Sequence, residues 1–195
     1  MGTARRGRNG HISHYFAGYS SFPAPMNKDP LKLVVAAIAG AYFLWCAYDP
    51  YKWHLIDGVN LLIHEAGHIV FQPFGEFMTI AGGSLFQVIM PALFVGYFCY
   101  HQKFYSAALV LFWVGESILN VSVYAGDSLA LQLPLLGGED TLHDWNYMLG
   151  TLGLLPSTAK IGGTIRVLGT VVIILACLGA YRYAEPDNRG EGLEM

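Results

Sequence analysis

The chain of 195 residues contains few charged side chains, since Asp, Glu, Lys and Arg together make up 13% of it. Soluble domains usually carry about 25%, whereas 54% of this sequence is hydrophobic and its mean hydropathy is +0.41. The length of the chain fits a single domain. The shortage of charge indicates that this domain lies in a lipid bilayer. No basic stripe or basic-aromatic repeat is present, so no nucleic-acid partner is expected.

Cysteine is also scarce. Cys46, Cys99 and Cys177 stand far apart in apolar stretches and form no CxxC pair. An odd number of cysteines in such positions is typical of buried free thiols. The pattern argues against a disulfide framework and against a cysteine zinc site.

The first 27 residues lack the apolar core of a signal peptide and are rich in Gly, Ser and Arg. We interpret residues 1–27 as a flexible tail, residues 28–184 as one transmembrane domain and residues 185–195 as a polar tail. Basic residues precede the first apolar run, so the positive-inside rule predicts a cytoplasmic N-terminus. The expected location is a bacterial-type cytoplasmic membrane.

Long apolar runs are abundant. Helices of this length can cross a hydrocarbon core of about 30 Å, and the runs occupy residues 31–48, 55–71, 84–100, 104–124 and 161–183. Residues 128–160 contain only short apolar pieces, which leave room for a re-entrant segment or half of a sixth span. The predicted fold is an all-α, multi-pass transmembrane helix bundle with five or six spans. Residues 77–80 are compatible with an extended segment.

The second apolar run contains His64-Glu65-Ala66-Gly67-His68. Residues four apart lie on one face of a helix, so His64 and His68 present two imidazoles to the same point. Zinc takes such a pair with a third protein ligand and keeps one position for water, which Glu65 can deprotonate as general base. Each ionisable group at the centre of a span costs about 2.5–3.5 kcal/mol on insertion scales. We therefore predict one Zn²⁺ per chain, with polar helix packing as the alternative.

The third ligand is open on these grounds. Glu116, Asn120 and Asp127 are spaced by four and seven, so a helix places them on one stripe that should face the bundle interior. Glu116 could ligate the metal, relay protons or bond another span. Asp127 follows Gly126, where a helix can loosen and direct a carboxylate to the metal.

A rival group lies at His143 and Asp144. His143 could be the third ligand and Asp144 could orient one. Alternatively, Asp140, Thr141 or Asp144 could simply cap a short helix, with Trp145 at the membrane interface. In the second and third runs, Asp57 is a candidate helix cap or support for the histidines, and Gln87 is interpreted as a hydrogen bond between spans.

On these residues the chain resembles the site-2 protease family of intramembrane zinc metalloproteases. Members carry HExxH in one transmembrane helix and, on a later helix, an Asn followed seven or eight residues on by the Asp that is the third zinc ligand. Asn120 and Asp127 follow that outline, and the resemblance covers about residues 55–128. It implies that His64, His68 and Asp127 hold the zinc and that Asn120 lies near the substrate.

The resemblance also implies an activity. The chain would hydrolyse peptide bonds in or near transmembrane segments of other membrane proteins. Residues 79–84, with Gly82 and Gly83, would either form an ordinary Gly-rich turn or pair with the unwound substrate as an added strand. Two alternatives remain: a non-proteolytic zinc-binding membrane protein, and a zinc hydrolase that acts on a lipid or a small amide. The sequence leaves the oligomeric state open.

Overall fold

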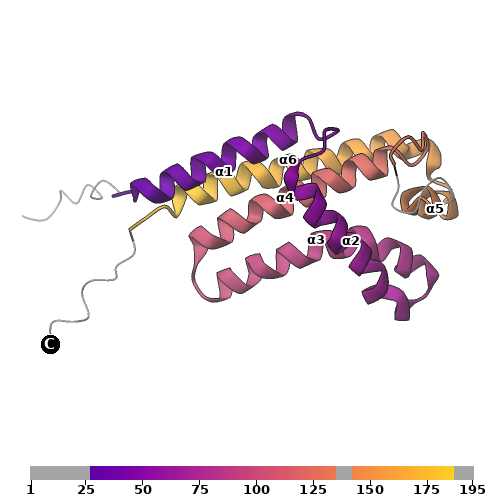
Figure 1. The fold of residues 1–195 in the computed structure, drawn as a ribbon, viewed down its shortest axis with the longest axis horizontal. Coiled ribbons are helices and arrows are strands. Elements are labelled where there is room, and N and C mark those ends of the chain that lie inside the picture. Colours follow the sequence, from indigo (N-terminus) through magenta and orange to yellow (C-terminus); the bar gives the residue numbers. More distant parts are fainter. Residues whose placement is uncertain (1–26, 135–141, 187–195) are drawn as a thin grey trace, which may run out of the picture.

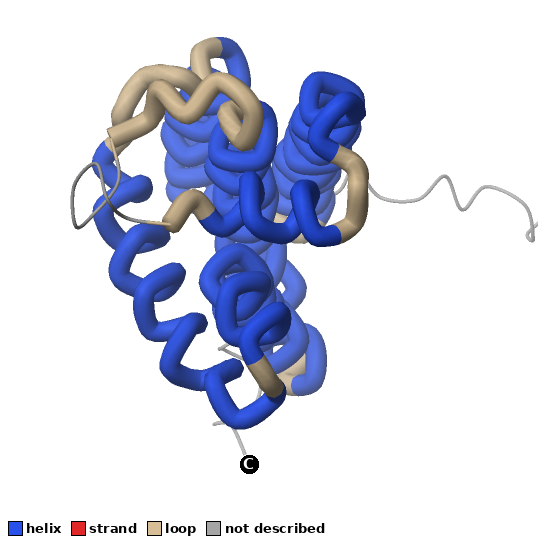
Figure 2. The backbone as a smooth tube through the Cα atoms, turned by 90° about the vertical axis from the view of Figure 1, so that its right-hand side faces the viewer, coloured by secondary structure: helices blue, strands red, loops and turns tan. Residues whose placement is uncertain are grey.

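The computed structural model describes residues 27–134 and 142–186, and this part is built from helices. The elements are α1 (Pro30–Tyr48), α2 (Leu55–Phe71), η1 (Gln72–Phe74), α3 (Glu76–Tyr100), α4 (Phe104–Gly126), α5 (Asp144–Thr151), η2 (Leu155–Ser157) and α6 (Thr158–Arg182). Figure 2 shows these helices joined by short loops, with no strand in the described part. The all-α prediction is confirmed. The predicted tails lie almost entirely outside the described residues.

Four helical segments are long and apolar enough to cross a membrane: α1, α3, α4 and Leu155–Arg182, which contains α6. Their presence supports a membrane protein. The predicted count of five or six spans is not confirmed, because α2 has 17 residues and α5 only 8. A helix rises 1.5 Å per residue, so α5 is too short to cross a bilayer.

The residues just before α1 and at the end of α6 meet at one end of the described bundle. The backbone N–H of Asp29 donates to the carbonyl of Ala184 over 3.0 Å, and Lys28 Nζ donates to the carbonyl of Arg182 over 2.8 Å. In Figure 1 the start of α1 and the end of α6 lie together, while α2 and α5 lie in the other half. The sequence had left the side of the C-terminal tail open; the structure places both ends of the bundle on one side.

The centre of the bundle is α4, which packs against α6, α3 and α1. Phe112 of α4 is fully buried and its ring stacks on Phe43 of α1, with 5.4 Å between centroids. Gly115 lets α6 approach closely, because a Cβ there would lie 2.6 Å from the Ile173 side chain. Small residues at crossing points are typical of helix packing in membranes.

Residues 77–80, expected to be extended, are helical. The chain turns at Gly75, where φ is +93°, and α3 then continues from Glu76 to Tyr100. Gly82 and Gly83 do not break this helix. A Cβ on Gly82 would lie 2.7 Å from the carbonyl oxygen of Gly67, so the glycines allow α3 to contact α2. The added strand predicted for residues 79–84 is therefore wrong.

Candidate metal centre

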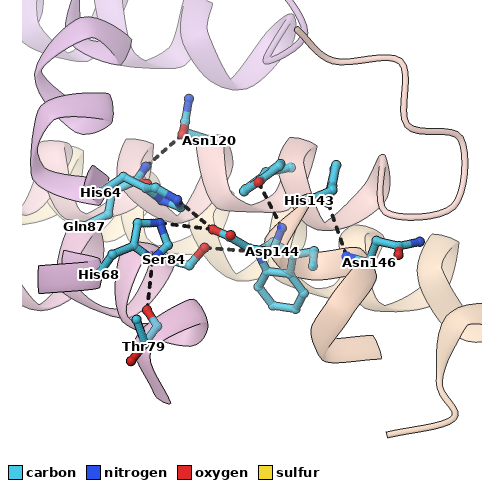
Figure 3. Close-up of polar contacts among 11 residues, drawn as sticks. His64, His68, Thr79, Ser84, Gln87, Asn120, His143, Asp144 and Asn146 are labelled. Atoms are coloured by element: carbon cyan, nitrogen blue, oxygen red, sulfur yellow. Dashed lines mark hydrogen bonds and ion pairs between the residues drawn. The ribbon is translucent and has the colours of Figure 1, made fainter. Parts of the chain in front are cut away.

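The two histidines of the motif face a carboxylate from a distant part of the chain. His64 Nε2 lies 2.9 Å and His68 Nε2 lies 3.4 Å from Oδ2 of Asp144, the first residue of α5 (Figure 3). The donor atoms of His64, Glu65 and His68 also lie within 4.8 Å of one another, so this group could hold a metal ion. Zinc ligands at 2.0–2.2 Å in a tetrahedron are separated by roughly 3.3–3.6 Å. The His68–Asp144 distance of 3.4 Å falls in that range, and the His64–Asp144 distance of 2.9 Å is that of a hydrogen bond.

Each imidazole is fixed by its other nitrogen. His64 Nδ1 lies 3.2 Å from Gln87 Oε1, and His68 Nδ1 lies 2.9 Å from the carbonyl oxygen of Thr79. Both partners are acceptors, so a neutral ring protonated on Nδ1 would present the lone pair of Nε2 to a metal ion. This arrangement is typical of metal-ligating histidines, whose second ring nitrogen donates to a carbonyl or carboxylate.

The convergence of these side chains makes the centre a fit for a cation. Both Nε2 atoms lie within 3.4 Å of the Asp144 carboxylate, where either an Nε2 proton or a bound cation can offset the negative charge. His64 and Asp144 are buried, so little water screens that charge. Two neutral imidazoles and one carboxylate form a ligand set that suits zinc.

Asp144 is held in place from three sides. His143 caps the start of α5 by accepting from the backbone N–H of Asn146 through Nδ1, at 3.2 Å. The backbone N–H of Asp144 donates to the Tyr124 hydroxyl over 3.1 Å, and Trp145 Nε1 donates to Ser84 Oγ over 3.0 Å. The short helix α5 is thereby tied to both α4 and α3, with its first carboxylate directed at α2.

A directional chain of hydrogen bonds supports His64. Asp57 accepts from Asn120 Nδ2 at 3.0 Å, and Asn120 Oδ1 accepts from Gln87 Nε2 at 2.8 Å. The Gln87 carbonyl is left facing His64. Asp57 Oδ1 accepts from Asn120, which orients both amides and leaves the Gln87 carbonyl as the acceptor that faces His64 Nδ1. The interpretation of Gln87 as a bond between spans is incomplete, since it also serves the motif.

A cavity of about 760 Å³ opens beside the centre. Ligand sites usually enclose 300–1,000 Å³. Its polar wall contains the motif residues, Asp144, Asp57, Gln87, Asn120 and Tyr124. Its lining also includes residues 50–53, between α1 and α2, and Leu133, Pro134 and Leu142. Glu65 is exposed there, so its carboxylate is accessible to water and to a ligand.

Asp127, which the family resemblance assigned as third ligand, is engaged elsewhere. Its carboxylate accepts from the backbone N–H groups of Gln132 and Leu133 at 3.0 and 2.9 Å and lies 3.5 Å from His143 Nε2. The helix α4 stays regular through Gly126, so the carboxylate turns to the loop that follows it. The structure places Asp144, not Asp127, against the two histidines.

The other candidates divide into two groups. His143 is 5% exposed and serves α5 as a cap; burial lowers its pKa, while the nearby carboxylates of Asp127 and Asp144 partly offset this, so the ring is neutral at pH 7. Glu116 lies within the bundle, where it accepts from Asn60 Nδ2. Asn120 lines the cavity and bonds to Gln87 and Asp57.

Comparison of the chain with protein-family models, with curated proteins and with solved structures finds no match. The account of this site therefore depends on the geometry of its residues.

Gly83 offers a direct test of that geometry. A Cβ there would lie 2.5 Å from His64 Nε2, whereas a Cβ at Gly96, on the same helix, meets nothing within 4 Å. Gly83→Ala is expected to displace the imidazole and weaken zinc binding at least ~10-fold, the smallest loss usual when a ligand is misaligned. Gly96→Ala should bind zinc like the wild type. Competition with a zinc-sensitive dye measures both, and equal affinities would contradict the placement of His64.

Gln87 tests the orienting chain. Gln87→Leu keeps the volume but removes the acceptor at His64 Nδ1, so zinc affinity should fall about 10–100-fold. Gln132→Leu, at an exposed side chain outside the chain of amides, is the control and should leave the affinity unchanged. Isothermal titration of both variants measures the difference. Wild-type affinity in Gln87→Leu would show that the amide does not support the ligand.

Proposed function

We propose that the protein is an intramembrane zinc endopeptidase in which His64, His68 and Asp144 hold the metal and Glu65 is the general base. The observation that carries the proposal is the convergence of two Nδ1-anchored imidazoles on one buried carboxylate. It occurs beside a cavity large enough for a peptide segment. The resemblance to site-2 proteases supports the same activity, with Asp144 in the ligand position implied for Asp127.

The chemistry follows from the positions of the side chains. A zinc ion held here supplies a Lewis acid that lowers the pKa of a coordinated water to about 7 and polarises a carbonyl. Glu65 is close enough to the same point to take a proton from the attacking water and deliver it to the leaving nitrogen. His64 and Asp144 are buried, whereas Glu65 is exposed and lines the cavity, so the substrate would approach the centre from the side of Glu65.

The described part of the chain contains no strand with which a substrate could pair. The side chains that line the cavity would therefore hold the substrate. A transmembrane helix hides its peptide bonds in its own hydrogen bonds and must unwind before it can be cut. The cavity lining includes Tyr51 and Trp53, residue types enriched at membrane–water interfaces. With a cytoplasmic N-terminus, this part of the lining would lie at the outer surface of the membrane.

Metal removal tests the proposal. Purified protein in detergent micelles is expected to cleave fluorescein-labelled casein, to lose that activity with 1,10-phenanthroline and to regain it when one equivalent of Zn²⁺ is restored, as a single-metal site requires. Labelled single-span peptides weakened by Gly or Pro form the second substrate set. Zinc-loaded protein that cleaves neither set would contradict the peptidase assignment and favour a non-proteolytic zinc protein.

A further inference from the structure

Tyr124 lines the cavity, and its hydroxyl accepts a hydrogen bond but donates none within the described part of the chain. Its hydroxyl accepts the backbone N–H of Asp144 at 3.1 Å, and among the described residues it donates no hydrogen bond. The side chain lies on the last turns of α4, and its ring is in edge contact with the ring of His64, with 5.6 Å between centroids. Tyr124 therefore has a free proton at the wall of the metal centre.

The bond to Asp144 also fixes where that proton can go. A phenolic oxygen that accepts an N–H on one side keeps its own O–H for another direction. Tyr124 lines the same cavity as His64, Glu65 and Asp144, so a ligand bound in that cavity can accept from its hydroxyl. The Nδ1 atoms of both histidines and the side-chain amides of Gln87 and Asn120 have other hydrogen-bond partners, and none of them is Tyr124.

We propose that Tyr124 is a catalytic residue that donates a hydrogen bond to the carbonyl oxygen of the bond being cleaved. When water adds to the carbonyl carbon, the π electron pair moves to this oxygen, and the Tyr124 O–H stabilises the negative charge without giving up its proton. A donor fixed before the reaction is more effective than water, which must reorient. The inference rests on the proposed peptidase function.

Two ligands separate this role from a purely structural one. A leucyl-leucine phosphinic pseudodipeptide places a charged oxygen where the carbonyl oxygen would carry charge, while leucinethiol can bind the metal but contains no oxygen. Zinc-loaded Tyr124→Phe is expected to bind the phosphinate about 10–100-fold more weakly, the effect of losing one hydrogen bond to a charged group. Its zinc content and its affinity for leucinethiol should match those of the wild type. Isothermal titration in detergent gives both affinities.

The control is Tyr147→Phe, which removes a hydroxyl from α5 outside the cavity lining and should change neither affinity. Unchanged phosphinate binding by Tyr124→Phe, or equal weakening of both ligands, would overturn the inference while leaving the peptidase intact. Equal weakening, or loss of zinc, would mean that Tyr124 only positions Asp144. If the zinc-loaded wild type binds neither ligand, the proposed function fails first.

Discussion

Asp144→Ala is expected to lose zinc, whereas Asp127→Ala is expected to retain about one zinc per chain, the stoichiometry of such a site. Asp144 supplies the carboxylate that faces both Nε2 atoms, and Asp127 supplies one that caps a loop. Mutation of a residue that only orients a metal ligand typically lowers the metal affinity about 10–100-fold. Removal of the ligand itself should therefore weaken zinc binding by more than about 100-fold.

The same pair of variants separates the metal site from the loop. Asp127→Ala removes the acceptor for the backbone N–H groups of Gln132 and Leu133, and it removes one of the two carboxylates near His143. Each net hydrogen bond to a charged group contributes about 1.5–3 kcal/mol, so the variant should be less stable and still bind metal. Elemental analysis of both purified variants measures the zinc. Zinc lost from Asp127→Ala and kept in Asp144→Ala would reverse the assignment.

Glu65→Gln is expected to keep the zinc and lose peptide cleavage. The glutamine has the same shape but cannot take a proton from water, and general base catalysis is typically worth 10²–10⁴-fold. The rate of casein hydrolysis should fall by about that factor, while the zinc content stays at that of the wild type. The measurement combines elemental analysis with initial rates on the same preparation.

Glu76→Gln is the matched control for this change. Like Glu65, Glu76 is an exposed glutamate on a helix. It lies in the first turn of α3 and does not line the cavity. Its variant should cleave at the wild-type rate. Undiminished cleavage by Glu65→Gln would remove the general base from the mechanism even if zinc were present.

How much the sequence predicts depends on how local the determinant is. The motif needs only the helical repeat of α2, because residues four apart share a face, and its donor atoms do lie close together. The apolar runs of α1, α3, α4 and α6 likewise depend on local composition. These are the parts of the fold that the sequence predicts correctly.

The third carboxylate is not local. Asp144 is 80 residues from His64 along the chain, and its position depends on how α5 is tied to α3 and α4. In the sequence, the helical stripe left the third ligand open and the family resemblance favoured Asp127, and only the structure shows its carboxylate turned to the loop. For Asp144 the sequence predicted only that it orients a ligand or caps a short helix.

The glycines of α3 show a second limit. Gly82-Gly83 has the composition of a turn, yet both residues lie inside a 25-residue helix. Glycine costs a helix up to about 1 kcal/mol per residue relative to alanine. Here the absence of a side chain lets α2 and the His64 ring approach, and such tertiary contacts are not visible in the local sequence.

The central claim is that His64, His68 and Asp144 bind one zinc ion, and zinc K-edge X-ray absorption of the purified protein tests it most directly. The expected spectrum shows two imidazole nitrogens at about 2.0–2.1 Å and oxygen ligands at about 2.0–2.2 Å. In Asp144→Ala the zinc signal should be lost, and in Asp127→Ala the spectrum should be unchanged. Protein purified without zinc that does not bind added Zn²⁺, or a spectrum without imidazole scattering, would contradict the account.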